Sequence, residues 1–310
     1  MINILYDCDP GQDDAMALLT ALGNSREISI LGVTTVGGNQ NIDLTTKNAG
    51  HLLKFCNQKI PLVKGQSRPL VRDLVPQPHA HGFTGMDGAN LSQYKYPLTS
   101  ENVVTFMAQI LSKATKKVTI VATAPLTNIA LLIKTYPELV RKIAKISLMG
   151  GGINHGNVTP LAEFNIWTDP EAAQIVFNSN LPIIMAGLDV TEKATLTKDE
   201  INSLHDKGKV SELAFKLLSF YQRSGEKFGF IDSPIHDLVA MEYVLHPEIF
   251  SGFKAKINII TETGPALGLT YIQPCKDIEK NVLVLNQVNR IEFKRVLFKA
   301  LETLDKNIFD

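Results

Sequence analysis

Residues 2–19 read INILYDCDPGQDDAMALL, and this stretch decides which fold we expect. Its first five residues form an apolar run with the length of a short buried strand. Pro10 and Gly11 then predict a turn, and residues 13–19 have the pattern of the first turns of a helix. The acidic loop therefore joins a strand to a helix, which is where open α/β sheets bind their ligands.

The loop carries four carboxylates, at Asp7, Asp9, Asp13 and Asp14. Like charges this close repel one another, so the group indicates a bound cation or a reaction that uses the acids. Helix capping explains one or two acids but not four. An EF-hand is excluded, because Gln12 stands where that motif needs glycine and no glutamate closes the loop.

Strand, polar loop and helix alternate through the first two-thirds of the chain. This rhythm predicts an α/β fold: a single domain over residues 1–310 with a mostly parallel, Rossmann-like central sheet flanked by helices. The active site is expected at the C-terminal ends of the strands. Further strands are expected at residues 28–36, 118–121, 143–149 and 181–186, and helices at 44–55, 129–133 and 236–244.

Three segments depart from this rhythm. Residues 64–97 are rich in Pro, His and Gly, and so long an irregular stretch is typical of a functional loop or lid. Residues 197–228 are charged with helical spacing, and residues 271–285 predict strands joined by a turn that contains Pro274.

Composition excludes several classes of partner. Lysine plus arginine and aspartate plus glutamate both number 31, so no net positive charge attracts a polyanion, and we expect no nucleic-acid partner. No apolar run has the length of a membrane helix, and we expect no membrane partner. The three cysteines are far apart in sequence, and no apolar leader opens the chain, so we expect a cytoplasmic protein with reduced thiols.

Polar residues gather in the loops that follow the predicted strands. Besides residues 7–14, these are Asn39, Thr123, the run 154–165 and the pair His236-Asp237. Oxygen ligands dominate, which favours Ca²⁺ or Mg²⁺ over Zn²⁺. For each of these residues an ordinary turn or capping role remains the alternative.

Six separated segments, in order, resemble the inosine-uridine-preferring nucleoside hydrolase family over residues 2 to about 245. They are Asp7 to Ala15, Val36-Gly37-Gly38-Asn39, Pro125-Leu126-Thr127-Asn128, Met149 to Gly152, Ala162 to Asn165 with Asp169 to Ala172, and His236-Asp237. The resemblance implies hydrolysis of the N-glycosidic bond of ribonucleosides to ribose and free base, and so a part in nucleoside catabolism and in purine and pyrimidine salvage. It also implies a homotetramer or homodimer.

The resemblance further assigns a Ca²⁺ cofactor. Its ligands would be Asp9, Asp14, Asp237 and the backbone carbonyl of Thr123, together with ribose hydroxyls and a water. Asp9 would also act as the catalytic base that takes a proton from this Ca²⁺-bound water. A carboxylate base is needed because Ca²⁺ acidifies water only modestly.

The resemblance assigns the contacts with the ribose, including its 5′-hydroxyl, to several residues with polar or pocket-lining side chains. These substrate-binding residues are Asp13, Asn39, Met149, Asn157, Glu163, Phe164 and Asn165. Surrounding carboxylates would stabilise the positive charge that develops on the sugar. Asp7 is left without a catalytic part, and we expect it to support the loop from beneath, with Cys8 as a small buried neighbour.

The sequence indicates less clearly which residues contact the nucleobase. His236 is the catalytic candidate for activating the leaving base, and His81 matches a position that the family uses near the base. Either His81 contacts substrate or it is a surface histidine, and Phe83 stands where many members have an acid. Tyr221, Phe228 and Phe230 either pack a helix or close over the base. The single Trp167 excludes a pair of indoles, so pyrimidine preference and broad specificity both stay open.

Two other functions compete. A Mg²⁺-dependent phosphatase with an aspartate nucleophile also begins with a strand and Asp-x-Asp, as in Asp7-Cys8-Asp9. However, further acids would repel a phosphate, and these loops lack the Arg, Lys and glycine-rich N–H nests that bind one. A binding protein that holds a nucleoside without cleaving it is disfavoured because the candidate base, Asp9, is intact.

Overall fold

Strand β1 (Ile2–Cys8) is the centre from which the sheet is built. In the computed structural model, which describes residues 1–309, β1 pairs in parallel with β2 on one side and with β4 on the other. The predicted mostly parallel sheet is confirmed: of eight strands, only the edge strand β9 runs antiparallel to its neighbour. The order across the sheet is β3 (Leu62–Lys64), β2 (Ile28–Thr35), β1, β4 (Val118–Ala122), β5 (Ile143–Met149), β6 (Ile183–Ala186), β12 (Val282–Val288) and β9 (Phe250–Ala255).

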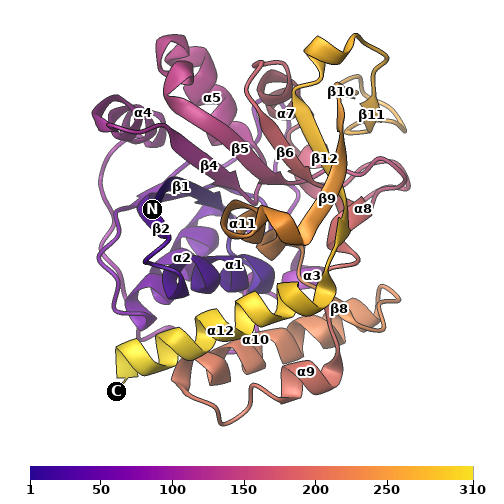
Figure 1. Ribbon diagram of the computed structural model, residues 1–310. Helices are drawn as coiled ribbons and strands as arrows, with labels where there is room; N and C mark the ends of the chain where they lie inside the picture. Colours follow the sequence, from indigo (N-terminus) through magenta and orange to yellow (C-terminus); the bar gives the residue numbers. More distant parts are fainter. Residues whose placement is uncertain (310) are drawn as a thin grey trace.

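Both faces of the sheet are covered by helices, as expected when a parallel strand is apolar along its whole length. In β1, Ile4 and Tyr6 pack into one hydrophobic core, whereas Leu5 packs into the other. Figure 1 shows the two helical layers. The first core is built with α1 (Gln12–Gly23), α2 (Ile42–Phe55), α10 (Lys209–Glu226), α11 (His236–Leu245) and α12 (Arg290–Phe309). The second uses α4 (Val103–Lys113), α5 (Thr127–Thr135) and α7 (Pro170–Phe177).

The strand order reverses between β1 and β4. After β1 the chain builds outward through β2 and β3, and it then returns to the other side of β1 to build β4, β5 and β6. Such a switch point leaves a crevice outside the carboxyl ends of the two strands, because their connections diverge to opposite sides. The acidic loop after β1 and Thr123 after β4 lie at this crevice.

Shorter elements complete the fold. They are α3 (Pro78–His81), α6 (Phe164–Thr168), α8 (Leu188–Thr191), α9 (Lys198–Asn202), the strand pairs β7 (Thr195–Leu196) with β8 (Ser233–Pro234) and β10 (Ile257–Ile259) with β11 (Thr270–Ile272), and the 3-10 turns η1 (Pro137–Lys142), η2 (Pro247–Ile249) and η3 (Asp277–Glu279). The helical pattern at 197–228 is two helices, α9 and α10, separated by residues 203–208.

One expectation for the C-terminal part is corrected. Residues 271–285 do contain strands, but β11 and β12 belong to different sheets and are not joined by a turn at Pro274. The connection is the segment 273–281, which includes η3. This segment is charged and largely exposed, so it has no apolar side to hold the two strands against each other.

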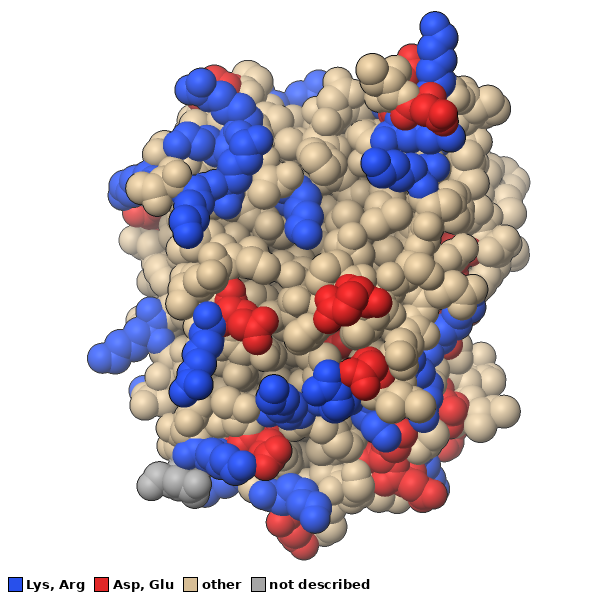
Figure 2. Space-filling view, in the orientation of Figure 1, with Lys and Arg blue, Asp and Glu red and all other residues tan. Residues whose placement is uncertain are grey.

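The surface carries charges of both signs. Figure 2 shows Lys and Arg gathered at the upper left, over α4 and α5, and Asp and Glu towards the middle and lower right. Among the described residues, none of the helices combines the length and apolarity needed to span a membrane.

Candidate active site

Asp7 lies beneath the acidic loop and is fully buried. Its Oδ1 accepts hydrogen bonds from Oγ1 of Thr34 (2.5 Å) and from Nδ2 of Asn128 (2.8 Å). Burial raises the pKa of Asp7 to about 6, and these two hydrogen bonds oppose the rise. The supporting part expected for Asp7 is confirmed, as is the burial of Cys8 beside it.

Asp9 follows β1 and is held by the loop after β2. Its Oδ2 accepts a hydrogen bond from the backbone N–H of Asn39 (2.6 Å), and Nδ2 of Asn39 donates to the Asp9 carbonyl oxygen (3.2 Å). A Cβ at Gly38 would lie 1.9 Å from Asp9 Oδ2, so only glycine permits this approach. The second oxygen, Oδ1, is buried and has no hydrogen-bond partner among the described residues.

Three further acids converge above the β1–β4 switch point. Asp13, Asp14 and Asp237 each offer a carboxylate oxygen, and these oxygens lie within 4.8 Å of one another. Asp14 Oδ1 accepts hydrogen bonds from Oγ1 of Thr123 (2.6 Å) and from the hydroxyl of Tyr6 (3.2 Å). Burial, together with the charge on Asp13, raises the pKa of Asp14 to about 7, and burial also raises the pKa of Asp237.

The donor set fits a hard cation. Oδ1 of Asp13, like that of Asp9, is buried without a hydrogen-bond partner in the described part of the chain. Uncompensated buried carboxylates are costly, and a divalent cation with oxygen ligands removes that cost. The three acids whose oxygens lie within 4.8 Å of one another include Asp13, whereas the resemblance names Asp9 with Asp14 and Asp237 as ligands.

Two of these acids, Asp13 and Asp237, line a cavity of about 380 Å³, within the size range of small-molecule sites. No Lys or Arg of the described residues lines it. Of the residues that the resemblance assigns to the metal, the substrate or catalysis, those that line the cavity are Asp13, Asn39, His81, Thr123, Met149, Asn157, Glu163, Phe164, Asn165, His236 and Asp237. Asp9 and Asp14 do not line it, because both are fully buried behind lining residues.

Glu163 organises one wall of the cavity. As the N-cap of α6 it accepts hydrogen bonds from the backbone N–H groups of Asn165 (2.9 Å), Gly151 (2.8 Å) and Ile166 (3.2 Å). Burial nonetheless raises its pKa to about 7, against the effect of these donors. One carboxylate thus fixes the loop after β5 and the start of α6 together.

The same wall presents two asparagine side chains. Nδ2 of Asn165 donates to the carbonyl oxygens of Thr123 (3.3 Å) and Met149 (3.2 Å), so it ties the ends of β4 and β5 together. Oδ1 of Asn157 accepts from the backbone N–H of Phe164 (2.9 Å). These contacts hold amide groups at the cavity surface, where a sugar hydroxyl could exchange hydrogen bonds with them.

Two histidines, His81 and His236, also line the cavity. Nδ1 of His236, at the start of α11, is hydrogen-bonded to Oγ1 of Thr191 (2.7 Å). His81, at the end of α3, is only 7% exposed, so the alternative of a surface histidine is wrong. Burial lowers the pKa of both imidazoles, while the charge on Asp13 opposes that shift.

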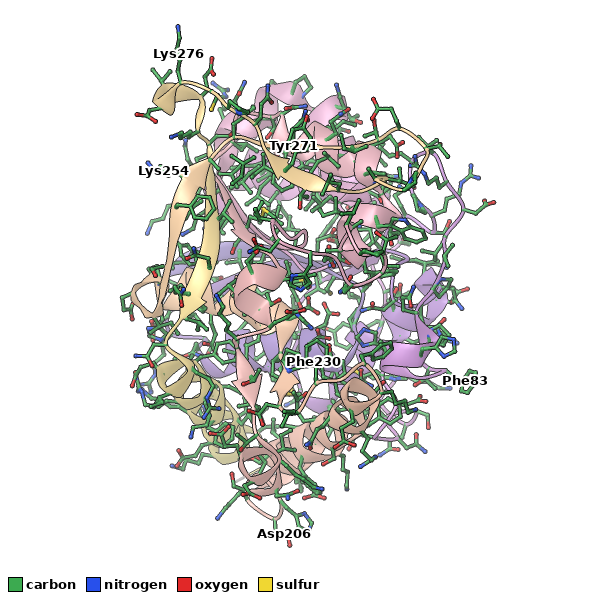
Figure 3. All side chains as sticks on the ribbon, turned by 90° about the vertical axis from the view of Figure 1, so that its right-hand side faces the viewer. Phe83, Asp206, Phe230, Lys254, Tyr271 and Lys276 are labelled. Carbon is green, nitrogen blue, oxygen red and sulfur yellow. The ribbon has the colours of Figure 1, made fainter. Side chains whose placement is uncertain are left out.

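Aromatic side chains from the end of α10 and the loop after it contact these histidines, Tyr221 on His81 and Phe230 on His236. Tyr221, Phe228 and Phe230 all line the cavity, which favours the second of their two predicted roles, closure over a ligand. The Tyr221 hydroxyl donates to Asp13 Oδ2 (3.1 Å). Phe83 is 86% exposed, and Figure 3 shows it projecting from the edge of the molecule, whereas Phe230 lies near the centre.

Several residues of the site were not identified from sequence. Asn128 was noted only as part of a motif, yet it also donates to the Thr35 carbonyl (2.9 Å) and accepts from the Gln66 N–H (3.0 Å). Gln12 contacts His81, and Glu192 and Ser224 line the cavity. Gln12 could have been found, because a polar residue at the buried start of an apolar helix needs a partner.

The geometry defines an enzyme of the α/β class with buried acids around a small cavity at the sheet's switch point, whose described lining holds no Lys or Arg. The family model described as inosine-uridine preferring nucleoside hydrolase matches residues 4–295. The chain belongs to this family. It is a ribonucleoside hydrolase, an enzyme that acts on N-glycosyl compounds.

The named relatives are all ribonucleoside hydrolases, but their names differ in the nucleobase that they prefer. The pyrimidine-specific ribonucleoside hydrolase RihA of Citrobacter koseri is 41% identical over 273 residues, 87% of each chain. RihA of Shewanella baltica is 40% identical over 309 residues, 98% of this chain and 97% of the relative. The purine-preferring ribonucleoside hydrolase of Gardnerella vaginalis has a similar structure, with a TM-score of 0.90 at 29% identity over 98% of this chain and 99% of that one.

Proposed function

We propose that this ribonucleoside hydrolase prefers pyrimidine nucleosides, with uridine and cytidine as substrates. The names of the relatives at about 40% identity support this preference, because they are described as pyrimidine-specific. The observation that carries the chemistry is the group of buried acids beside a cavity without Lys or Arg. Such a site suits a neutral polyhydroxylated ligand that becomes positively charged in the transition state.

We further propose that Asp9, Asp14, Asp237 and the Thr123 carbonyl hold Ca²⁺. Bound Ca²⁺ would acidify a water and orient the ribose hydroxyls. Asp9 is assigned as the base that takes the proton from the attacking water. Its Oδ1 has no hydrogen-bond partner among the described residues, which supports this assignment because a general base needs a free oxygen lone pair.

The remaining carboxylates and amides are assigned to the sugar. Asp13 and Asn165 would bind ribose hydroxyls, with Asn39 fixing the same edge. Asn157 and Glu163 would hold the 5′-hydroxyl, while Met149 and Phe164 line the sugar pocket. As the glycosidic bond lengthens, positive charge grows on the ring, and the carboxylates stabilise that state more than the neutral substrate.

The activation of the departing nucleobase and the contacts with it are assigned to the two histidines. His236 would activate it, and His81 would contact it from α3. Thr191 supports this assignment, since its hydroxyl fixes the orientation of the His236 ring.

A panel of ribonucleosides, assayed for released reducing sugar, tests the preference. We expect uridine and cytidine to be cleaved with kcat/KM at least about tenfold above that for inosine, a difference of about 1.4 kcal/mol. Equal values for all three would replace pyrimidine preference with broad specificity. Hydrolysis of p-nitrophenyl phosphate in place of nucleosides would favour the phosphatase alternative.

Assembly and location are also proposals. We propose a homodimer or homotetramer, which light scattering during size-exclusion chromatography would measure. We propose a cytoplasmic location, supported by the three free cysteines. Export of the native protein to the periplasm or medium, detected by cell fractionation, would contradict it.

A further inference from the structure

We propose that Gln12 is a positioning residue that holds the proton of neutral His81 on Nδ1, so that Nε2 faces the substrate as a hydrogen-bond acceptor for an N–H group of the base. The proposal rests on the proposed function, because it assigns the base to the His81 side of the cavity. It adds a chemical reason for selecting among bases. Nε2 would favour a base that presents an N–H donor to it.

The Gln12 amide has all its close contacts in one small region. Its Nε2 lies 3.1 Å from the carbonyl oxygen of His81 and 2.9 Å from that of Asp87. Its Oε1 lies 2.9 Å from Nδ1 of His81. Gln12 itself is fully buried.

These contacts determine where the protons are. A carbonyl oxygen only accepts, so the amide atom beside the two carbonyls must be the NH₂ group. The other amide atom is therefore the oxygen, which also only accepts. Consequently the hydrogen bond between Gln12 and His81 requires a proton on Nδ1 of His81, and the neutral ring then has its lone pair on Nε2.

Packing prevents the His81 ring from turning over. A Cβ at Gly11 would lie 2.4 Å from His81 Nδ1, so the ring rests directly on the backbone of the acidic loop. The ring is also stacked on Tyr221, with 5.5 Å between centroids and an interplanar angle of 21°. Ser224 of α10 also donates to the carbonyl oxygen of His79 (2.8 Å), which fixes the same short helix.

The arrangement leaves Nε2 as the ring nitrogen without a hydrogen bond to the described residues, in a side chain that lines the cavity. Uracil carries an N3–H donor, whereas 3-methyluridine replaces that hydrogen with a methyl group. The fixed tautomer therefore predicts discrimination between the two nucleosides. A substrate such as p-nitrophenyl riboside, whose leaving group has no N–H, should not sense it.

The first test is the tautomer itself. Protein labelled with ¹⁵N-histidine is measured by NMR without ligand, and the His81 signals are identified by their loss in His81→Asn. We expect the shifts of a ring protonated on Nδ1 in the wild type. A ring protonated on Nε2 would overturn the proposal whatever the kinetics show.

The second test is kinetic and uses two glutamine variants. Gln12→Met keeps the length of the side chain but removes its hydrogen bonds. Gln40→Met is the matched control, because Gln40 Nε2 donates to the Phe83 carbonyl (3.2 Å) and so anchors the same loop without contacting the His81 ring. The readout is the ratio of kcat/KM for uridine to that for 3-methyluridine.

We expect Gln12→Met to lower this ratio by about fivefold, the value of one hydrogen bond, and to leave p-nitrophenyl riboside hydrolysis within about twofold. Gln40→Met should keep the wild-type ratio. An unchanged ratio in Gln12→Met, or an equal fall in both variants, would overturn the proposal. If even the wild type cleaves no riboside, the proposed function fails, but the NMR measurement still tests the tautomer of His81. The same NMR measurement on the wild type tests the proposal if Gln12→Met does not fold.

Discussion

Asp7 and Asp9 stand two residues apart but have different surroundings. Asp7 accepts two side-chain hydrogen bonds on Oδ1, whereas Asp9 accepts one backbone hydrogen bond on Oδ2, and each carboxylate has a second oxygen without a hydrogen-bond partner among the described residues. Hydrogen bonds that are already made fix a carboxylate in place, and a free oxygen can take a proton. At the scale of single residues, the partner of each carboxylate favours Asp9 as the proposed base, because its donor Asn39 lines the cavity, whereas Thr34 and Asn128, the donors to Asp7, do not.

The assignment of Asp9 as the catalytic base predicts the effect of replacing its carboxylate. Asp9→Asn keeps the shape and the hydrogen bond from the Asn39 N–H but cannot take a proton, so we expect kcat for uridine to fall by about 100- to 10,000-fold. Ribose should still bind, as measured by calorimetry. The control is Asp43→Asn on the exposed side of α2, which should leave kcat unchanged. If Asp9→Asn turned over uridine at the wild-type rate, Asp9 would not be the catalytic base.

His236 offers a second prediction at this scale. A purine accepts a proton more readily than a uracil ring does, so a residue that activates the leaving base matters more for inosine. We expect His236→Ala to reduce kcat/KM for inosine by at least about tenfold more than for uridine. Steady-state assays with both nucleosides measure this, and equal losses would assign His236 a structural part instead.

At the scale of elements, α11 joins the site to the core. Its first turn carries His236 and Asp237, and the helix runs between α1 and β5 with apolar residues on most sides. Glu242 lies on this helix, fully buried, and neither carboxylate oxygen has a hydrogen-bond partner among the described residues. Burial raises the pKa of Glu242 well above its ordinary value.

The sign of the resulting pH dependence follows from linkage. Glu242 is protonated in the folded protein at pH values where it is already ionised in the unfolded chain, so the free energy of unfolding falls as pH rises above about 4.5. Glu242→Gln cannot ionise and escapes this loss. We therefore expect the melting temperature of the variant minus that of the wild type to be larger at pH 8 than at pH 5, by about 2 °C or more. A difference that does not change with pH, in thermal unfolding at both values, would contradict the expected ionisation.

At the scale of the whole molecule, the sequence predicts those features of the fold that depend on residues close together in the chain. The β1 loop, the alternation of strand and helix and the polar residues at strand ends all repeat at short range, and the parallel sheet follows from them. The contacts of His81 with Gln12 and Tyr221 join segments far apart in the chain, and no spacing predicts them. For the same reason the strands at 271–285 were expected but their separate sheets were not, because pairing partners lie outside any local pattern.

Because the chain closes around buried acids, we expect its stability to depend on a cation. Helix α1 brings Asp13 and Asp14 to the switch point and α11 brings Asp237, and no Lys or Arg of the described cavity lining neutralises them. A cation bound there stabilises the folded state by mass action, about 2.7 kcal/mol at a hundredfold excess over its Kd. We expect Ca²⁺ to raise the melting temperature of chelator-treated protein by several degrees and to restore its activity, with Mg²⁺ less effective. Asp237→Asn should lose the shift, whereas Asp206→Asn, in the exposed group with His205 and Glu212, should keep it. A fully active and equally stable protein after exhaustive chelation would exclude the metal site.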